Sequence, residues 1–239
     1  MDGNRGHGDM ACGTMTFVVD RMRPWSFPGS YADERGCEPI VWQVEPFDTP
    51  DMGGNYELRT VVRGIPIGGG QFDALGPDPG NSRACDSLPL DRFNDLTSCT
   101  LGGELPCAIE VRGIRRTEII RFTFELNPDP EPDKMHLAVT IDGTTYETDC
   151  DALETGLAQL ATACAADTSL VCCFTCLYSD YSPASSLVMG MRCHRDAKEQ
   201  YLAVRSKADI WSVPVTEHVP ETYLCPQYRL RIAGTGYRG

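Results

Sequence analysis

The sequence of 239 residues predicts a β-rich α+β protein, in which an antiparallel sheet or sandwich carries one packed helix and a zinc ion holds the C-terminal part together. Three observations lead to this fold class. Runs of β-branched and aromatic residues alternate with Gly, Pro and Asp through the first 150 residues. One later segment has a helical period, and cysteines gather in the last third of the chain.

Six segments have the composition of β-strands, because β-branched and aromatic residues form short runs between turn-forming residues. The period of two is clearest where Ile120, Phe122 and Phe124 alternate with polar residues, which predicts one buried and one wet face. Asp142-Gly143 predicts a hairpin turn, since both positions of such a turn need positive φ. The six segments and the return strand of the hairpin are residues 16–20, 39–45, 56–67, 108–114, 117–126, 135–141 and 144–149.

One helix is predicted, in the segment CDALETGLAQLATACA. Its residues Leu153, Leu157 and Leu160 are spaced i, i+4 and i+7, so they form a single apolar stripe that would pack on the sheet. Asp149 or Asp151 is the expected N-cap, because an aspartate oxygen can accept the free amide hydrogens of the first turn.

The remaining segments predict loops and short strands. Residues 68–98 and 127–133 are too rich in Gly, Pro and Asp for regular structure. Short strands are expected at 170–178, where the strand ends in a knuckle, and at 185–195, 200–206 and 228–234. We therefore divide the chain into a flexible tail (1–14), a β-rich region that ends in the helix (15–165) and a cysteine-rich zinc-binding region (166–239). The last two could form one continuous domain.

The chain is acidic, with a formal net charge of −13. Residues 1–150 carry 25 acidic and 13 basic side chains, so a net charge of −12 lies in this front part. Such a surface repels phosphate backbones, which disfavours nucleic acid as a partner. The charge is typical of a solvated acidic surface, and the alternative is a docking face for a basic partner. No run approaches the roughly 18 apolar residues of a membrane helix, and residues 1–15 have no signal-peptide core, so we expect a cytoplasmic protein.

Cysteines carry the most specific chemical signal. The chain has 12 of them, which we expect to be reduced in a cytosol rather than paired as disulfides. Cys173-Phe-Thr-Cys176 is a C-x-x-C half-site of the kind found in many zinc folds, because two thiolates at this spacing can reach one ion. Cys193 and Cys225 follow in turn-like surroundings. We predict that these four thiolates bind one zinc ion, the metal that a soft ligand set without redox chemistry favours.

Two other interpretations of the cysteines stay open. They could be buried thiols that act only as small apolar side chains. The C-x-x-C pair could also be a redox dithiol, although such motifs usually open a helix and the sequence after Cys176 is a poor helix opener. If Cys225 were not a ligand, the metal would keep an open position and could be catalytic instead of structural.

An enzyme of unrecognised type is a further alternative, with its site near the knuckle and with Asp180, His194 or Arg195 as candidate groups. The segment Tyr178–Pro183 that contains Asp180 is also typical of a structural turn. The chain lacks the Walker-type phosphate loop, the G-x-S-x-G elbow and the H-E-x-x-H helix, and it lacks the elements of zinc deaminases.

The cysteine motifs and their neighbours resemble those of a known family. The chain contains C-x-x-C-x-YSDYSP, then M-x-C-x-R, then ETYLCP and finally GTGYRG. This order is similar to that of an uncharacterised, mainly actinobacterial family with a domain-of-unknown-function label. The resemblance covers the last third of the chain well, and it implies bacterial origin and a role for the motif cysteines. Where that family has C-F-R, this chain has Cys193-His194-Arg195, which argues against a general role for His194. The front segments Tyr31–Gly36 and Thr60–Gly64 fit the family more loosely.

These observations together favour a non-catalytic, acidic interaction protein with a structural zinc site. An immunity or antitoxin protein is one example, because acidic proteins of this size attract basic toxins through charge. The alternatives are the enzyme with a site near the knuckle and a cysteine redox sensor. The partner itself is not identified by the sequence.

Overall fold

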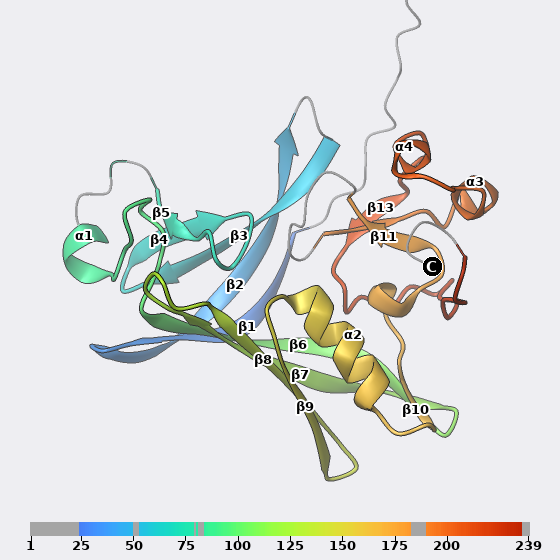
Figure 1. Cartoon of the computed structure of the whole chain (residues 1–239), viewed down its shortest axis with the longest axis horizontal. Coiled ribbons are helices and arrows are strands. Elements are labelled where there is room, and N and C mark those ends of the chain that lie inside the picture. Colours follow the sequence, from blue (N-terminus) through green and yellow to red (C-terminus); the bar gives the residue numbers. More distant parts are fainter. Residues whose placement is uncertain (1–23, 50–52, 79, 81–83, 183–189, 236–239) are drawn as a thin grey trace, which may run out of the picture.

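A single large antiparallel sheet dominates the computed structural model, which describes residues 24–49, 53–78, 80, 84–182 and 190–235. The strand order is β5-β4-β3-β2-β1-β6-β7-β8-β9, and β10 pairs with the far end of β6. A smaller sheet, β11-β12-β13, lies beside it, and helix α2 covers part of the large sheet (Figure 1). The β-rich α+β class with an antiparallel sheet is thus confirmed. The predicted tail and the predicted strand 16–20 lie outside the described residues.

The strands follow the chain with few crossovers. In the large sheet they are β1 (Trp25–Asp33), β2 (Gly36–Thr49), β3 (Gly53–Val62), β4 (Ile65–Gly69), β5 (Gly76–Pro77), β6 (Cys99–Val111), β7 (Ile114–Leu126), β8 (Lys134–Ile141), β9 (Thr144–Cys150) and β10 (Thr168–Leu170). The small sheet contains β11 (Ser179–Tyr181), β12 (Met191–Cys193) and β13 (Glu217–Val219). The helices are α1 (Ala84–Ser87), α2 (Leu153–Ala163), α3 (Lys198–Leu202) and α4 (Lys207–Ile210).

Three tight hairpin turns set the register of the large sheet. The predicted turn at Asp142-Gly143 is confirmed, with φ of 50° and 80° at the two residues. The same geometry occurs twice more, at Arg63-Gly64 and at Arg112-Gly113. The interpretation of residues 56–67 as one strand is therefore wrong: the segment is the hairpin of β3 and β4.

Strand β1 and the first half of β6 were not predicted, because Gly and Pro interrupt both segments. The structure gives these glycines a packing role. Gly29 of β1 lies under the ring of Trp42, and a Cβ at this position would come within 2.4 Å of Trp42 Nε1. The same indole N–H donates to the carbonyl oxygen of Gly102 on β6 at 2.8 Å. The missing side chain of Gly29 thus lets the buried tryptophan lie directly on β1.

Helix α2 is confirmed close to its predicted bounds, and it packs on β8 and β9 through Leu153, Leu157 and Leu160. The predicted aspartate cap is wrong. The N-cap is Ala152, which makes no side-chain capping bond. The helix is therefore held mainly by the burial of its apolar stripe rather than by its cap.

The glycine within this helix allows close contact with the sheet. A Cβ on Gly156 would lie 2.7 Å from Cys150 Sγ and 2.9 Å from both methyl groups of Leu137, which is fully buried. We expect Gly156→Ala to lower the melting temperature, because overpacking costs about 1–3 kcal/mol and outweighs the gain of about 1 kcal/mol in helix propensity. Thermal unfolding followed by circular dichroism measures this. The control is Ala158→Gly on the exposed face, and a higher melting temperature for Gly156→Ala would contradict the packing argument.

The C-terminal part contains more turns and short helices than predicted. Residues 170–178 form the end of β10, a 3₁₀ turn at Cys173–Thr175 and then a bridge, so only the start of this segment is a strand. Residues 200–206 were predicted as a strand but lie largely in and after α3, and residues 228–234 contain only a single bridge, at Leu230. These two strand predictions are wrong. Tyr201 and Ala203 donate to carbonyls of their own helical turn, whereas Arg229 and Arg231 bond to the segment 175–177 at a single bridge.

Candidate metal centre in the C-terminal part

The four predicted ligand cysteines come from three separate segments and are all buried. Cys173 and Cys176 lie at the two ends of the 3₁₀ turn, Cys193 ends β12, and Cys225 lies in the loop that follows β13. Their exposed fractions are between 1% and 5%. Each of these three cysteine-bearing segments is short, so its position depends on hydrogen bonds to the other two.

Backbone hydrogen bonds join the turn Cys173–Cys176, which we call the knuckle, to the other cysteine segments. The amide of Cys173 donates to the carbonyl of Tyr223 at 2.8 Å, and the amide of Phe174 donates to the carbonyl of Glu221 at 2.9 Å. On the other side, Ser179 on β11 pairs directly with Cys193 on β12. The loop of Cys225 and the strand of Cys193 are therefore both fixed against the C-x-x-C turn.

Three of the thiols, those of Cys193, Cys176 and Cys225, lie close enough to Cys173 to affect the pKa of its thiol. Burial raises the pKa of the Cys173 thiol, and negative charge on Cys193, Cys176 or Cys225 raises this pKa further. A divalent cation reverses this effect, because it stabilises the thiolate form of each ligand.

Several donors point at the sulfurs. The backbone amide of Gln227 donates to Cys225 Sγ at 3.2 Å, which is an N–H···S bond between residues two apart. For Cys193, burial raises the thiol pKa, while the amide and the guanidinium of Arg195 lower it. Arg195 Nη1 lies 3.7 Å from Cys193 Sγ, and Nη2 of the same side chain lies 2.7 Å from the carboxylate of Glu217. Donors of this kind favour the thiolate form, as do the hydrogen-bonding groups that contact metal ligands in known metal sites.

Among the residues that the structure describes, no group of three or more His, Cys, Asp or Glu side chains is arranged so that it could hold a metal ion as it stands. The thiol side chains are thus gathered in one region, without a common centre at ligand distance. The assignment of Cys173, Cys176, Cys193 and Cys225 as metal ligands stays a prediction.

The alternative catalytic residues are held in structural contacts. Asp180 is 1% exposed and accepts a hydrogen bond from the hydroxyl of Tyr201 at 2.9 Å. The ring of His194 is fully buried and stacks on Tyr201 with centroids 5.0 Å apart. Arg231 donates to the Tyr201 hydroxyl at 3.2 Å and to the carbonyl of Cys176 at 2.9 Å. This network connects the last described segment to the knuckle.

We expect Tyr201→Phe to destabilise the protein by about 1–3 kcal/mol, because the buried carboxylate of Asp180 loses a donor while the aromatic packing is kept. Chemical denaturation monitored by tryptophan fluorescence measures the change. Tyr146→Phe, on a half-buried ring of β9, is the matched control. Equal stability of the two variants would show that the hydroxyl of Tyr201 contributes nothing.

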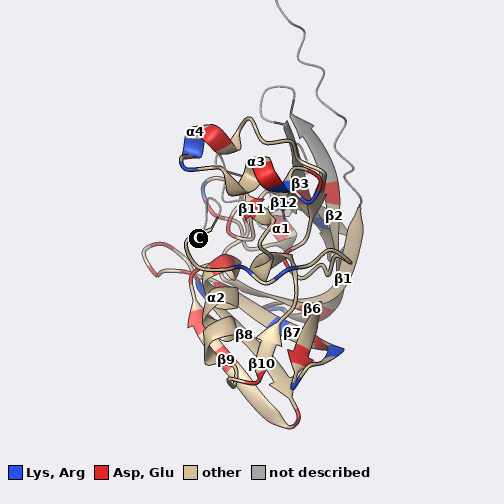
Figure 2. Cartoon of the chain, turned by 90° about the vertical axis from the view of Figure 1, so that its right-hand side faces the viewer, with Lys and Arg blue, Asp and Glu red and all other residues tan. Residues whose placement is uncertain are grey.

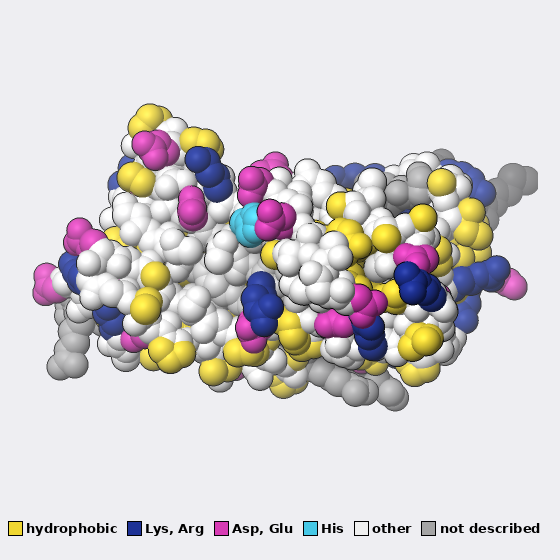
Figure 3. Space-filling model, turned by 90° about the horizontal axis from the view of Figure 1, so that it is seen from below, with side chains coloured by type: hydrophobic (Ala, Val, Ile, Leu, Met, Phe, Trp, Pro, Cys, Tyr) yellow, Lys and Arg dark blue, Asp and Glu magenta, His cyan; other side chains and the backbone are white. Residues whose placement is uncertain are grey.

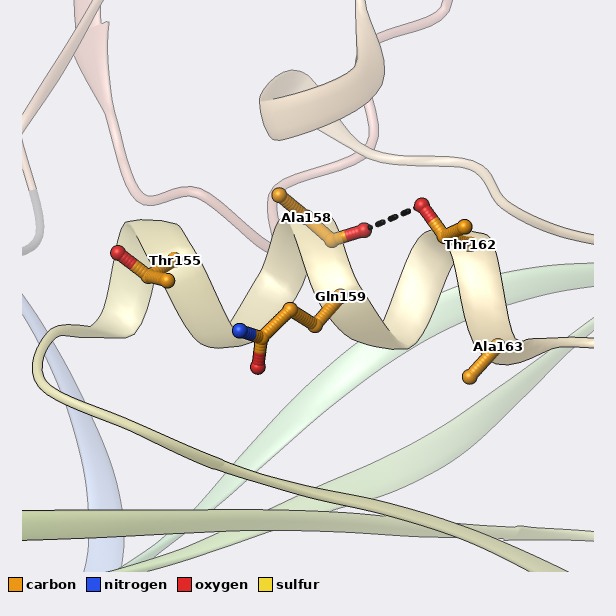
Figure 4. Close-up of a pocket in the computed structure, with 5 residues that line it drawn as sticks. All are labelled: Thr155, Ala158, Gln159, Thr162 and Ala163. Atoms are coloured by element: carbon orange, nitrogen blue, oxygen red, sulfur yellow. Dashed lines mark hydrogen bonds between the residues drawn. The ribbon is translucent and has the colours of Figure 1, made fainter.

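Two hollows lie on the surface away from Cys173, Cys176, Cys193 and Cys225. One, of about 410 Å³, lies along small side chains of α2 alone, with Thr155, Ala158 and Thr162 among them (Figure 4). It is an open helix face rather than a cleft, and Figure 4 shows Thr162 bonded back to the Ala158 carbonyl. The other, of about 300 Å³, lies where β1 and β7 end and β6 begins. Neither hollow includes Asp180, His194 or Arg195.

The second hollow, which we call the acidic hollow, is lined by Asp33, Glu34 and Glu125, and by polar backbone. Asp33 is paired with Arg63, and this pairing together with bonds from the Arg35 amide and the Tyr31 hydroxyl lowers the pKa of Asp33 to about 2 although burial opposes it. Glu34 and Glu125 are exposed. A positive side chain that enters the hollow would therefore meet carboxylates that are open to solvent.

Acidic and basic side chains are distributed over the whole molecule. Acidic groups lie on the large sheet and on helices α3 and α4 (Figure 2), and the face in Figure 3 mixes both signs with hydrophobic side chains. Within the described ranges no helix is long and apolar enough to cross a membrane.

Comparison with known proteins gives a family and no function. Neither the curated proteins nor the solved structures contain a match to the chain. The model of a family of unknown function, DUF6304, matches residues 25–179, a range that includes Cys173 and Cys176 and ends before Cys193. This match spans more than half of the chain and supports the predicted membership of an uncharacterised domain family. The chain belongs to the DUF6304 family of unknown function.

Proposed function

We propose that this chain is a non-catalytic interaction protein, in which a structural zinc ion on Cys173, Cys176, Cys193 and Cys225 supports the C-terminal part and the acidic hollow binds a basic protein partner. An immunity or antitoxin protein acts in this way. The observation that carries the proposal is the burial of four thiols from three chain segments within one small region. A cytoplasmic location and reduced cysteines belong to the same proposal.

The zinc assignment is supported by the chemistry around the sulfurs. Four thiols in one buried region give a soft donor set, which matches the closed tetrahedral shell of structural zinc. The C-terminal part has little regular structure, since β11, β12 and β13 are three residues each. A small, loop-rich region of this kind gains much of its stability from a bound metal. Binding requires the four side chains to turn toward a common centre.

Charge balance gives a second argument. Four thiolates and one Zn²⁺ carry a net charge of −2, which needs a compensating group in a buried region. Arg195 supplies a positive charge 3.7 Å from Cys193 Sγ, and Glu217 on β13 holds this guanidinium in place. We therefore assign Arg195 a positioning role beside the metal rather than a catalytic role.

The partner is proposed from the acidic hollow. Glu34 and Glu125 line this hollow beside Asp33, and no ion pair involves either glutamate within the described part of the chain. Its volume of about 300 Å³ admits a lysine or arginine side chain. The net charge of −13 adds a long-range attraction for basic proteins.

Metal analysis tests the first half of the proposal. The full chain is expressed without added metal, purified without chelators and measured by inductively coupled plasma mass spectrometry. We expect about one zinc per chain, bound tightly enough to survive dialysis and released when a mercurial reagent titrates the thiols. A protein that contains no zinc and binds none on addition would overturn the metal assignment.

A binding titration tests the second half. The probe is a fluorescent peptide of alternating lysine and arginine, and its anisotropy is followed at low and high salt. We expect binding that weakens with salt, and a weaker affinity in the double variant Glu34→Gln/Glu125→Gln. The matched control removes two distant carboxylates, in Asp142→Asn/Glu147→Gln. Equal loss in both double variants would leave only general charge attraction and would refute the acidic hollow as the binding site.

A further inference from the structure

A second pair of thiols lies at the seam between the large sheet and the knuckle, outside the proposed metal ligands. Cys107 on β6 and Cys172 after β10 are 1% and 0% exposed. They are 65 positions apart in the sequence and both are free thiols in the structure. The proposed function uses neither of them.

The sheet register places these two cysteines opposite each other. Strand β10 pairs with β6 so that Leu170 faces Ile109. The amide of Val171 then donates to the carbonyl of Ala108 at 2.8 Å, which continues the ladder by one residue. The next pair in this antiparallel register is Cys172 with Cys107. Cys172 has an extended backbone, with φ of −149°, so the strand geometry reaches it.

Cys107 and Cys172 occupy the type of antiparallel pair in which opposite side chains come closest. Because Val171 and Ala108 form a hydrogen-bonded pair, Cys172 and Cys107 form the next, non-hydrogen-bonded pair. In such a pair the Cα atoms are about 4.5 Å apart, within the range of disulfide bridges. Both side chains lie on the buried face.

We propose that Cys107 and Cys172 are a redox-active pair that forms a cross-strand disulfide when the protein meets a peroxide. A peroxide oxidises one thiol to a sulfenic acid and releases one water. The second sulfur then attacks the sulfenic sulfur, the S–S bond forms, and the hydroxyl leaves with the remaining thiol proton as a second water. Two thiols and one hydrogen peroxide thus give one disulfide and two waters.

The surroundings allow the reaction and give it a consequence. Strand β10 has only three residues, so local opening at this end of the sheet can admit a molecule as small as hydrogen peroxide. The bond would tie β6 covalently to the residue that precedes Cys173. Oxidation at the seam would therefore fix the knuckle against the large sheet. This inference goes beyond the proposed function and holds whether or not the chain binds zinc.

Mass spectrometry of the oxidised full chain tests the pair. Reduced protein is treated with increasing hydrogen peroxide, quenched in acid, alkylated with N-ethylmaleimide in denaturant and digested with two proteases. We expect a peptide pair that joins Cys107 to Cys172 and that dithiothreitol separates. The matched control is Cys99→Ser, a buried thiol on the same strand, which should form the same bridge, whereas Cys107→Ser should not.

The disulfide peptides of the oxidised wild-type protein show whether Cys107 and Cys172 are joined, even where a variant fails to fold. Quantitative N-ethylmaleimide labelling of both Cys107 and Cys172 in oxidised protein would overturn the proposal. A bridge that joins either of them only to another cysteine would also overturn it. Zinc content measured on the same samples separates the outcomes, since bridges among Cys173, Cys176, Cys193 and Cys225 accompany metal loss and report on the metal site instead.

Discussion

Cys176→Ser is expected to remove the zinc ion and to unfold much of the C-terminal part. The serine oxygen is a poor ligand for zinc among thiolates, and the metal-binding energy of a structural site is folding energy, on the order of 10 kcal/mol in small peptides. Most of the larger core comes from strands of the large sheet, although Cys173 and Cys193 also belong to it, so we expect the loss to be greatest in the C-terminal part. Metal analysis combined with hydrogen exchange of the amides in β11, β12 and β13 measures both effects.

The controls separate a ligand from a merely buried thiol. Cys172→Ser changes a neighbouring thiol that is as buried as the proposed ligands, and it should keep the metal. Cys37→Ser changes an exposed thiol and should behave as the wild type in both measurements. Cys225→Ser should reproduce the effect of Cys176→Ser. If Cys176→Ser retains its metal and its amide protection, the four-thiolate site does not exist.

Trp42→Ala is expected to destabilise the large sheet by about 3–5 kcal/mol, because it removes a large buried side chain and leaves a cavity. The Trp42 ring is fully buried and meets Phe72 edge-on at 5.3 Å between centroids. The variant also leaves the carbonyl of Gly102 without the indole donor. For a chain of this length the loss corresponds to a fall in melting temperature of roughly 10 °C.

The neighbouring residue provides the control for this experiment. Val41 lies on the opposite face of β2 and is 57% exposed, so Val41→Ala should change the free energy of unfolding by less than about 0.5 kcal/mol. Calorimetry of both variants gives the comparison. Similar losses for Trp42→Ala and Val41→Ala would mean that the indole is not part of the folding core.

Regular alternation and turn chemistry made much of the large sheet predictable. Strands β7 and β8 and the hairpin at Asp142-Gly143 followed directly from local sequence. The hairpins at Arg63-Gly64 and Arg112-Gly113 carry the same signal, because V-R-G-I occurs at both and only a glycine at the second position makes the turn easy. Strand β1 was not predictable, since its one glycine, Gly29, is explained only by a tryptophan from another strand.

The candidate site was predictable to a smaller degree. The C-x-x-C spacing identifies Cys173 and Cys176 as a pair, but nothing local shows which distant segments approach them. Arg195 is two residues after Cys193, so an extended backbone would place both side chains on one face, and this signal could have been used. The partner of Cys172 follows only from the register of β10 on β6, which depends on tertiary packing.

The pairing of β6 with two different strands limits how the chain can be shortened. Its first half borders β1, and its last residues border β10, which comes after the helix. A fragment that stops at residue 165 would leave the final residues of β6 with bare amide and carbonyl groups next to apolar side chains such as Ile109. Exposed edges of this kind join to other copies and precipitate. Fragments for expression should therefore extend beyond Leu170.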